Sequence, residues 1–143
     1  MRVVVCGTFD YAHEGHKHLF EYVKKVFGRI DRVYITTDEF VSKRKIPTHN
    51  QKERWLAVSK LVSKNTQLEF ISTNEDFRES ICMESPCVVI HANDHNINTL
   101  SEIYCVEHNW WENNQIYLLY KDRYPGISST QLRELEKCQK KEN

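Results

Sequence analysis

The sequence predicts an α/β fold: a single Rossmann-like domain with a five-stranded, mainly parallel sheet and helices on both faces. Short apolar runs alternate with longer segments in which apolar residues recur at helical spacing, which is typical of βα units. The first run, "RVVVC" at residues 2–6, is apolar almost throughout, as in a strand covered on both faces. At 143 residues and without a Pro/Gly-rich linker, the chain fits one domain over residues 1–143.

The predicted strands are the short β-branched or aromatic runs. In chain order they cover residues 2–6, 32–36, 68–72, 87–92 and 115–120. Because helical segments separate them, the strands are expected to lie mostly parallel, with right-handed crossovers. In such sheets ligands bind beyond the carboxyl ends of the strands, so the residues that follow each strand are the first candidates for a site.

The predicted helices differ in the strength of their pattern. The clearest covers residues 15–27 and places one apolar face on Leu19, Tyr22, Val23, Val26 and Phe27. Residues 50–63 form a second, with Asn50 as its N-cap. A short helix is expected over about 75–83, a weak one over 98–108, and a last one from Ser128 to about 139. The charged end, about 137–143, is expected to fray.

Composition excludes several classes of protein. Twenty Lys and Arg residues balance twenty Asp and Glu residues, which argues against a general nucleic-acid or membrane binder. No apolar stretch approaches the roughly 18 residues of a membrane span, and the first residues have a strand pattern rather than that of a signal peptide. The five cysteines are an odd number, which favours free thiols and a cytoplasmic protein.

One cysteine and histidine cluster has two interpretations. The stretch "CMESPCVVIHANDH" contains four residue types that bind zinc, at Cys82, Cys87, His91 and His95. However, "CVVIH" has the pattern of a buried strand, whose alternating side chains would scatter the ligands. We therefore favour ordinary thiols and loop histidines over a zinc site.

The stretch "GTFDYAHEGH" at residues 7–16 joins the first strand to the first helix. Gly7 lets the backbone turn, Thr8 offers a hydroxyl, and Gly15 allows a ligand close to the helix start. The unpaired N–H groups of a helix N-terminus suit phosphate. His13 and His16 are neighbours there and can stabilise developing negative charge. The stretch thus indicates polyphosphate binding, although glycine-rich turns and capping histidines also occur without ligands.

This stretch resembles the G-T-F-D-x-x-H-x-G-H signature of the cytidylyltransferase-like nucleotidyltransferases. "RYPGISSTQLR" at 123–133 is similar to the same superfamily's I-S-S/T-T element, with the Arg-x-x-Gly prefix of cytidylyltransferases. Between them, "TTDEF" (36–40), "KRK" (43–45) and "HNQKER" (49–54) are similar to segments of glycerol-3-phosphate cytidylyltransferases. The resemblance covers nearly the whole chain, in order and in length.

The resemblance implies transfer of a cytidylyl group from CTP to a phosphate monoester such as glycerol 3-phosphate. Direct in-line attack would release pyrophosphate without a covalent enzyme intermediate, and Mg²⁺ would bind mainly through the nucleotide phosphates. The catalytic residues it implies are His13, His16, Lys43 and Arg123. It assigns nucleotide binding to Gly7, Thr8, Phe9, Asp10, Gly15, Asp94, His95, Arg123, Gly126, Ile127, Ser128, Ser129 and Thr130. It assigns acceptor binding to Asp10, Lys43 and Arg54. Simpler roles for some of these residues are surface charge for Lys43 and Arg54, and N-capping for Ser128 to Thr130.

Two departures from the family pattern bear on substrate and assembly. "ANDH" at 92–95 stands where glycerol-3-phosphate cytidylyltransferases usually have G-D-D-W, so the nucleobase is less well specified. The R-Y-V-D element that helps those enzymes to dimerise is replaced by "KLVSKN" at 60–65, which leaves a homodimer as a family-level expectation. The alternatives are an adenylyltransferase similar to phosphopantetheine adenylyltransferase and a non-catalytic nucleotide-binding module. The "WW" pair at 110–111 is expected to pack a helix end rather than line an acceptor pocket.

Overall fold

The computed structural model describes residues 1–10, 14–43, 47–91, 103–104, 106 and 108–118. Within these residues, one sheet of five strands has the order β3-β2-β1-β4-β5, and every neighbouring pair is parallel. The strands are β1 (Arg2–Gly7), β2 (Arg32–Thr36), β3 (Gln67–Ile71), β4 (Cys87–His91) and β5 (Gln115–Leu118). The predicted α/β fold with a five-stranded sheet is confirmed, and the sheet is parallel throughout these pairs.

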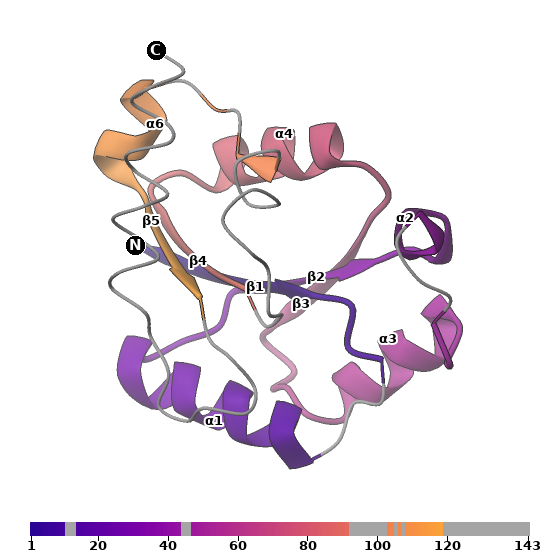
Figure 1. The fold of residues 1–143 in the computed structure, drawn as a ribbon. Coiled ribbons are helices and arrows are strands. Elements are labelled where there is room, and N and C mark those ends of the chain that lie inside the picture. Colours follow the sequence, from indigo (N-terminus) through magenta and orange to yellow (C-terminus); the bar gives the residue numbers. More distant parts are fainter. Residues whose placement is uncertain (11–13, 44–46, 92–102, 105, 107, 119–143) are drawn as a thin grey trace.

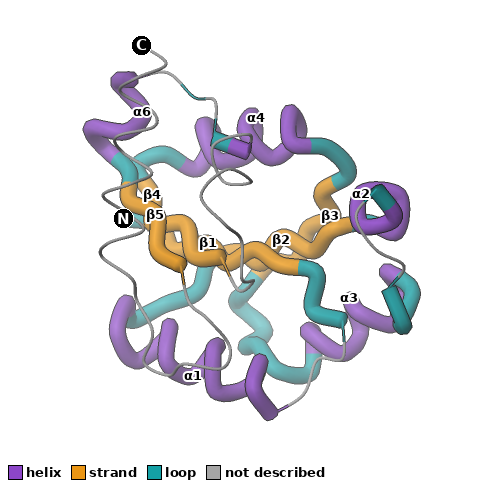
Figure 2. Tube along the Cα trace, viewed as in Figure 1, coloured by secondary structure: helices purple, strands orange, loops and turns teal. Residues whose placement is uncertain are grey.

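The helices lie in two layers, one on each face of the sheet. They are α1 (Glu14–Phe27), α2 (Asp38–Ser42), α3 (Gln51–Ser59), α4 (Asn74–Glu84) and α6 (His108–Asn113). Figure 1 shows α1 and α3 below the sheet and α4 and α6 above it. The helices drawn in purple in Figure 2 thus sandwich the strands drawn in orange. This is the doubly wound arrangement that alternating strands and helices predict.

Two apolar cores follow from this layering. Side chains from β1, β2 and β4 that point towards α1 and α3 form the first core, which includes Val5, Leu19 and Val58. Side chains that point to the other face meet α4 and α6 in the second, which includes Val89 and Ile81. All the residues of β4, and all but the first of β1, are buried, which explains why both runs are apolar almost throughout.

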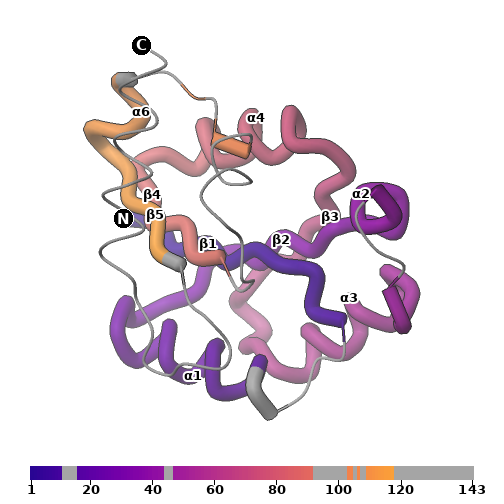
Figure 3. The backbone as a smooth tube through the Cα atoms, viewed as in Figure 1, coloured from indigo at the N-terminus to yellow at the C-terminus, as the bar shows by residue number. Residues whose placement is uncertain are grey.

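The strand order reverses at the middle of the sheet. The chain runs outward from β1 through β2 to β3, and then returns to place β4 on the other side of β1. Figure 3 follows this path: the indigo β1 lies between the purple β2 and the later β4. The carboxyl ends of β1 and β4 therefore flank the topological switch point, which is where doubly wound sheets bind ligands.

The predicted strands match the observed ones to within one or two residues, and the helices show three differences. The five residues of α2 were not predicted, because so short a helix has too few residues to display periodicity. The helix expected over 50–63 ends at Ser59, although Asn50 caps it as predicted. The helix α6, which begins at His108, meets the weak helix expected over 98–108 only at its last residue, and most of 98–108 lies outside the described residues. The last predicted helix, from Ser128, lies outside the described residues.

Candidate active site

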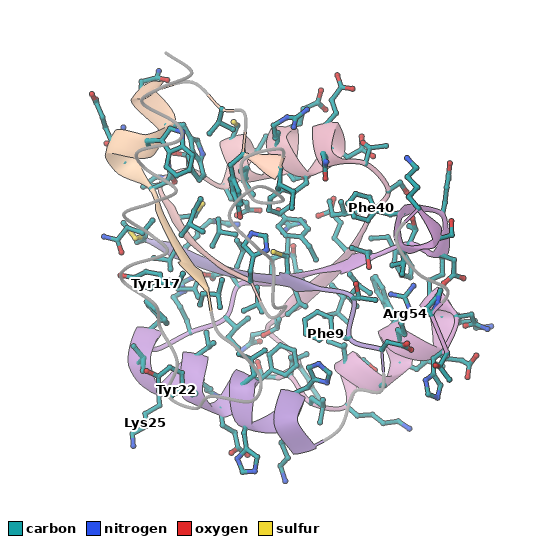
Figure 4. The ribbon with its side chains drawn as sticks, viewed as in Figure 1. Phe9, Tyr22, Lys25, Phe40, Arg54 and Tyr117 are labelled. Carbon is teal, nitrogen blue, oxygen red and sulfur yellow. The ribbon has the colours of Figure 1, made fainter. Side chains whose placement is uncertain are left out.

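The turn after β1 has an unusual backbone. Phe9 adopts a φ of 56°, in the left-handed region that residues with a side chain seldom enter. Its ring is 1% exposed and stacks on Phe20, with the ring centres 5.5 Å apart. Figure 4 shows Phe9 between the sheet and α1. Such a conformation costs about 1–3 kcal/mol, so packing of the Phe9 ring in the core must hold it in place.

His16 lies in the first turn of α1 and is 3% exposed. Its ring meets the edge of Phe9, with the ring centres 5.3 Å apart. Because Phe9 is itself anchored in the core, the imidazole is held at the start of the helix by the same turn that ends β1. His13, the other member of the predicted histidine pair, lies outside the described residues. Gly15 takes its predicted place in the first turn of α1.

The Asp10 carboxylate binds the backbone ahead of α3. Its two oxygens accept hydrogen bonds from the backbone N–H groups of Thr48 and His49, each at 2.9 Å. His49 Nδ1 lies 3.4 Å from Asp10 Oδ1. Burial by itself would raise the pKa of Asp10, but the two amide bonds and the His49 ring outweigh it and lower that pKa. The carboxylate thus stays ionised and joins the β1 turn to the residues before α3.

Arg54 is buried at the same end of the sheet, where its guanidinium has four protein partners. Nη1 donates to the carbonyl oxygens of Thr8, at 2.9 Å, and Thr36, at 2.7 Å. Nη2 donates to Asp38 Oδ1 at 2.9 Å, and Nε donates to the His49 carbonyl oxygen at 3.1 Å. Four of the five N–H groups of an arginine side chain are therefore engaged. In Figure 4, Arg54 lies close to α2 and α3, at the side of the molecule where β1 ends.

Arg54 thus lies in a buried network of protein partners, and its predicted role in acceptor binding stays a prediction. The sequence also allowed a surface arginine, and that alternative is wrong, because none of the side chain is exposed. A direct contact with a substrate phosphate without loss of these bonds could use only the fifth N–H group, and no part of the side chain is exposed in this structure. In the structure Arg54 holds the carboxyl ends of β1 and β2 in fixed positions relative to α3.

Several residues of the site join β1 to β2. Thr36 Oγ1 donates a hydrogen bond to Thr8 Oγ1 at 3.1 Å, across the ends of the two strands. Thr37 then caps α2 by accepting a hydrogen bond from the Phe40 N–H at 3.2 Å. Lys43 is the exposed residue that ends α2. Gly7, Thr8, Phe9 and Asp10 follow one another at the carboxyl end of β1, which flanks the switch point.

Other predicted site residues lie outside the described part of the chain. They are Asp94, His95, Arg123, Gly126, Ile127, Ser128, Ser129 and Thr130. The prediction that the first and last helices meet in one phosphate site therefore stays a prediction.

Sequence reasoning missed two contributors to this end of the sheet. Asp38 is recognised only from its bond to Arg54, because acidic residues at a helix start are too common to indicate a site. His49 was noticed only as part of a similar segment. Its position immediately before the predicted N-cap Asn50 was a usable signal, since a residue there is fixed by the helix start.

The zinc hypothesis can be compared with three of its four residues. Cys87 and His91 are the first and last residues of β4 and are both buried, whereas Cys82 is exposed on α4. Our expectation that strand alternation separates Cys87 from His91 is wrong, because residues four apart share a face. They are instead separated along the strand, by about 13 Å. No group of three possible metal ligands occurs among the residues that the structure describes.

His91 belongs to a different cluster in the core. Its Nδ1 lies 3.2 Å from the Cys6 thiol, and its Nε2 hydrogen-bonds to the Tyr104 hydroxyl. Burial raises the pKa of both Cys6 and Tyr104, so both stay protonated at neutral pH. Cys6 and Tyr104 thus both have His91 as a partner inside the apolar core.

The tryptophan pair packs as expected. Trp110 is 6% exposed within the core between α4, α6 and the sheet, and Trp111 packs against the same core. Their rings meet edge to face, with centres 5.4 Å apart. In the described segments, no helix has the length and apolar character needed to cross a membrane.

Comparisons with known proteins agree with this architecture. The chain is similar to a lipopolysaccharide core biosynthesis protein from Thermoplasma volcanium, with 18% identity and a TM-score of 0.58 over 82% of this chain and 94% of that one. It is also similar to a protein of unknown function from Archaeoglobus fulgidus, with 18% identity and a TM-score of 0.61 over 85% of this chain and 90% of that one. At these identities the likeness shows the fold alone. No curated protein matches the sequence significantly.

The family is shown by a match over most of the chain. The cytidylyltransferase-like family model matches residues 4–135, which include β1 with its following turn and α1. The chain therefore belongs to the cytidylyltransferase-like family and is a nucleotidyltransferase.

Proposed function

We propose that this nucleotidyltransferase transfers a cytidylyl group from CTP to a phosphate monoester such as glycerol 3-phosphate. The observation that carries the proposal is the fixed position of His16 at the start of α1, directly beyond the switch-point end of β1. A helix N-terminus offers backbone N–H groups and a partial positive charge to phosphate oxygens. A histidine at that point adds a donor where charge develops during transfer.

The reaction that fits this site is a direct displacement. A phosphate oxygen of the acceptor forms a bond to the α-phosphorus of the nucleotide. The bond from that phosphorus to the bridging oxygen breaks, and pyrophosphate leaves with the electron pair. Most of the catalysis then comes from positioning the two phosphates and stabilising their charge. Because His16 is almost fully buried, its interaction with phosphate is screened less than at the surface.

The remaining roles follow from the family resemblance. His13 acts beside His16, while Lys43, exposed at the end of α2, binds the reacting phosphates. The β- and γ-phosphates bind to Arg123 and to the segment Gly126, Ile127, Ser128, Ser129 and Thr130. The resemblance assigns Asp94 and His95 to binding of the nucleobase.

In this proposal Mg²⁺ binds to the protein together with the nucleotide. This cation keeps several waters and binds readily through phosphate oxygens. The two carboxylates described at this end of the sheet, Asp10 and Asp38, already have protein partners. This donor set fits a cation held mainly by the nucleotide, which would neutralise the charge that develops on the phosphates.

A substrate panel tests the proposal. The full-length protein is incubated with CTP or ATP and Mg²⁺, each with glycerol 3-phosphate or phosphopantetheine, and pyrophosphate release is measured. We expect release with CTP and glycerol 3-phosphate. Release with ATP and phosphopantetheine alone would instead identify an adenylyltransferase. Saturable nucleotide binding without turnover across the panel would favour a non-catalytic module. Light scattering during the assay shows whether the active form is a homodimer.

Replacement of His16 tests the residue that carries the proposal. His16→Ala is expected to lower kcat about 100-fold or more, because it removes a donor that acts on the developing charge. His18→Ala is the matched control: this histidine lies on the same helix, has an exposed side chain and lies 3.9 Å from Glu21. An unchanged kcat for His16→Ala, in a protein that keeps its unfolding midpoint, would remove His16 from the mechanism.

A further inference from the structure

A groove lies between α4 and α6, on the face of the sheet opposite α1. Its volume is about 840 Å³, which falls within the roughly 300–1,000 Å³ of clefts that hold ligands in other proteins. Among the described residues that line it, none is assigned to nucleotidyl transfer. The sheet lies between this groove and α1, which carries His16. The groove is therefore a feature that the proposed reaction does not use.

One wall of the groove is a single side of α4. Four residues of that helix line it: Glu75, Arg78, Glu79 and Cys82. Their spacing of i, i+3, i+4 and i+7 places them in one stripe about 10 Å long. Met83 also lines the groove and is 87% exposed, the largest fraction among the large apolar residues described. Because methionine is flexible, it adapts readily to the surface of a partner.

The opposite wall repeats this spacing. It is lined by Val106 and, on α6, by Asn109, Trp110 and Asn113, again at i, i+3, i+4 and i+7. Val106 and Trp110 are buried and form an apolar floor, whereas the two asparagines are exposed at the rim. An amphipathic helix that binds in a groove presents its own side chains at the same spacing. Two facing stripes of this kind therefore suit a third helix better than a compact small molecule.

The exposed charges of the groove are acidic. Glu75 and Glu79 are both exposed, and within the described part of the chain neither carboxylate forms an ion pair. Arg78, which lies beside Glu79 on α4, is half-buried and donates to the Ile103 carbonyl oxygen at 3.3 Å. A helix bound in the groove thus meets negative charge along the α4 wall. Electrostatic complementarity selects an occupant with basic side chains on that side.

We propose that the groove between α4 and α6 binds an amphipathic, basic helix of a protein partner. The apolar side chains of that helix contact Trp110 and Met83, and its basic side chains lie along Glu75 and Glu79. This interaction goes beyond nucleotidyl transfer and does not depend on it. Because the sheet separates the groove from α1, the partner leaves the proposed catalytic site open.

Two labelled peptides test the chemistry of the occupant. The first is a helix of about 15 residues with leucine at i, i+3, i+4 and i+7 and lysine at the flanking positions, and the second has glutamate in place of lysine. Fluorescence anisotropy measures the binding of each to the full-length protein. We expect the lysine peptide to bind saturably, more weakly as salt rises, and about tenfold or more tighter than the glutamate peptide. Absence of lysine-peptide binding, or equal affinity for both peptides, would overturn the proposal.

Variants then show whether the lysine peptide binds in the groove. Glu79→Lys should weaken its binding about fivefold or more, because attraction becomes repulsion. Met83→Asp should weaken it about tenfold or more, because an apolar contact is lost. Glu21→Lys is the matched control, since it makes the same charge change on α1 at a side chain that is 61% exposed. An equal loss of binding in Glu21→Lys would show that net charge, and not the groove, attracts the peptide.

A second copy of this chain is the alternative occupant. Light scattering over a range of protein concentrations measures self-association of the wild type and of both groove variants. A dimer that Glu79→Lys or Met83→Asp separates would assign the groove to a second copy and overturn the proposal of a distinct partner. A monomer, or a dimer that both variants keep, supports it. Pyrophosphate release should be the same in both variants as in wild type, because neither residue belongs to the proposed catalytic site.

Discussion

The two ends of the sheet use charged side chains in opposite ways. At the amino end, acidic and basic side chains pair with one another. At the carboxyl end, Asp10 and Arg54 bind mainly to backbone groups of turns and strand ends. The first arrangement joins regular elements, whereas the second holds irregular backbone in place. The difference indicates which end is built for stability and which for a ligand.

The amino end centres on Glu84, the last residue of α4, which is 6% exposed. Its carboxylate forms ion pairs with Arg2 and with Arg32, the latter at 3.0 Å between Nε and Oε1. Arg32 also pairs with Glu69 and hydrogen-bonds to Gln67 at 2.9 Å. One network thus connects the first residues of β1 and β2 to β3 and α4. Among the described residues, the charged groups of this network pair with one another.

The carboxyl end has a different balance. Phe9 is held in a left-handed conformation, Thr8 and Thr36 have their carbonyl groups held by Arg54, and the residues before α3 are held by Asp10. Backbone strain of this kind persists only where surrounding contacts over-determine it. Interactions that fix a site before the substrate arrives lower the cost of binding and of reaching the transition state. If this distinction is correct, mutations at the amino end should lower stability alone, whereas mutations at the carboxyl end should also lower activity.

The largest effect is expected from Arg54→Leu. The change leaves Asp38 and the carbonyl groups of Thr8, Thr36 and His49 without their guanidinium partner. A buried polar group that loses its partner costs about 1–3 kcal/mol, and several groups lose one here, so the free energy of unfolding in urea should fall by about 3 kcal/mol or more. Activity should fall as well, because the turn at Thr8 and the His49 backbone lose their support. Arg54→Lys keeps the charge but not the planar fork and should recover only part of the stability.

An Arg54→Leu protein with wild-type stability would contradict the network seen here. An Arg54→Lys variant with unchanged stability and a raised KM for the acceptor alone would instead support the original expectation that Arg54 binds substrate.

Much of the fold could be predicted because it depends on local pattern. The buried strands at 2–6 and 87–91 are almost continuously apolar, and the apolar residues of α1 recur at helical spacing. Both kinds of element can therefore be recognised in the sequence. The Asn50 N-cap was predictable for the same reason, since its side chain binds within one helical turn. The five-residue α2 was not, because its only local signal is a threonine cap.

The site was harder to predict because its bonds join residues distant in sequence. His16 and the turn at 7–10 were found from a motif within ten residues. In contrast, the Arg54 bonds to Thr8 and Thr36 span 46 and 18 positions, and their partners are backbone carbonyls with no sequence signature. A residue type alone does not show whether an arginine faces substrate or strand ends. That difference is set by burial, which only the assembled fold determines.

A smaller effect, confined to stability, is expected from Glu84→Gln. The amide keeps the shape but removes the charge that binds two arginines. Because Arg2 and Arg32 remain partly hydrated, the loss should be about 2 kcal/mol rather than the full cost of a buried pair. The kcat and both KM values should stay close to wild type, since the network lies at the far end of the sheet. A selective loss of activity in a stable Glu84→Gln protein would break the distinction between the two ends.

The smallest effect is expected from Asp31→Asn, and it should depend on pH. Asp31 accepts a hydrogen bond from the Val3 N–H at 2.7 Å and pairs with Arg29, which ties the segment before β2 to β1. Burial by itself would raise the pKa of Asp31, but these two partners outweigh it and lower that pKa. A carboxylate with a lowered pKa adds stability that is fully present above its unfolded value of about 3.9 and is lost as the pH falls below it.

Asp31→Asn should therefore cost about 1 kcal/mol at pH 7, because the side chain lies near the surface and its ion pair is screened. The difference from wild type should shrink below about pH 4, as the wild-type carboxylate takes up a proton and loses the same interactions. Urea unfolding of both proteins between pH 7 and pH 3 measures this convergence. A difference that stays constant over that range would show that the shape of the side chain, rather than its charge, secures the amino end of β2.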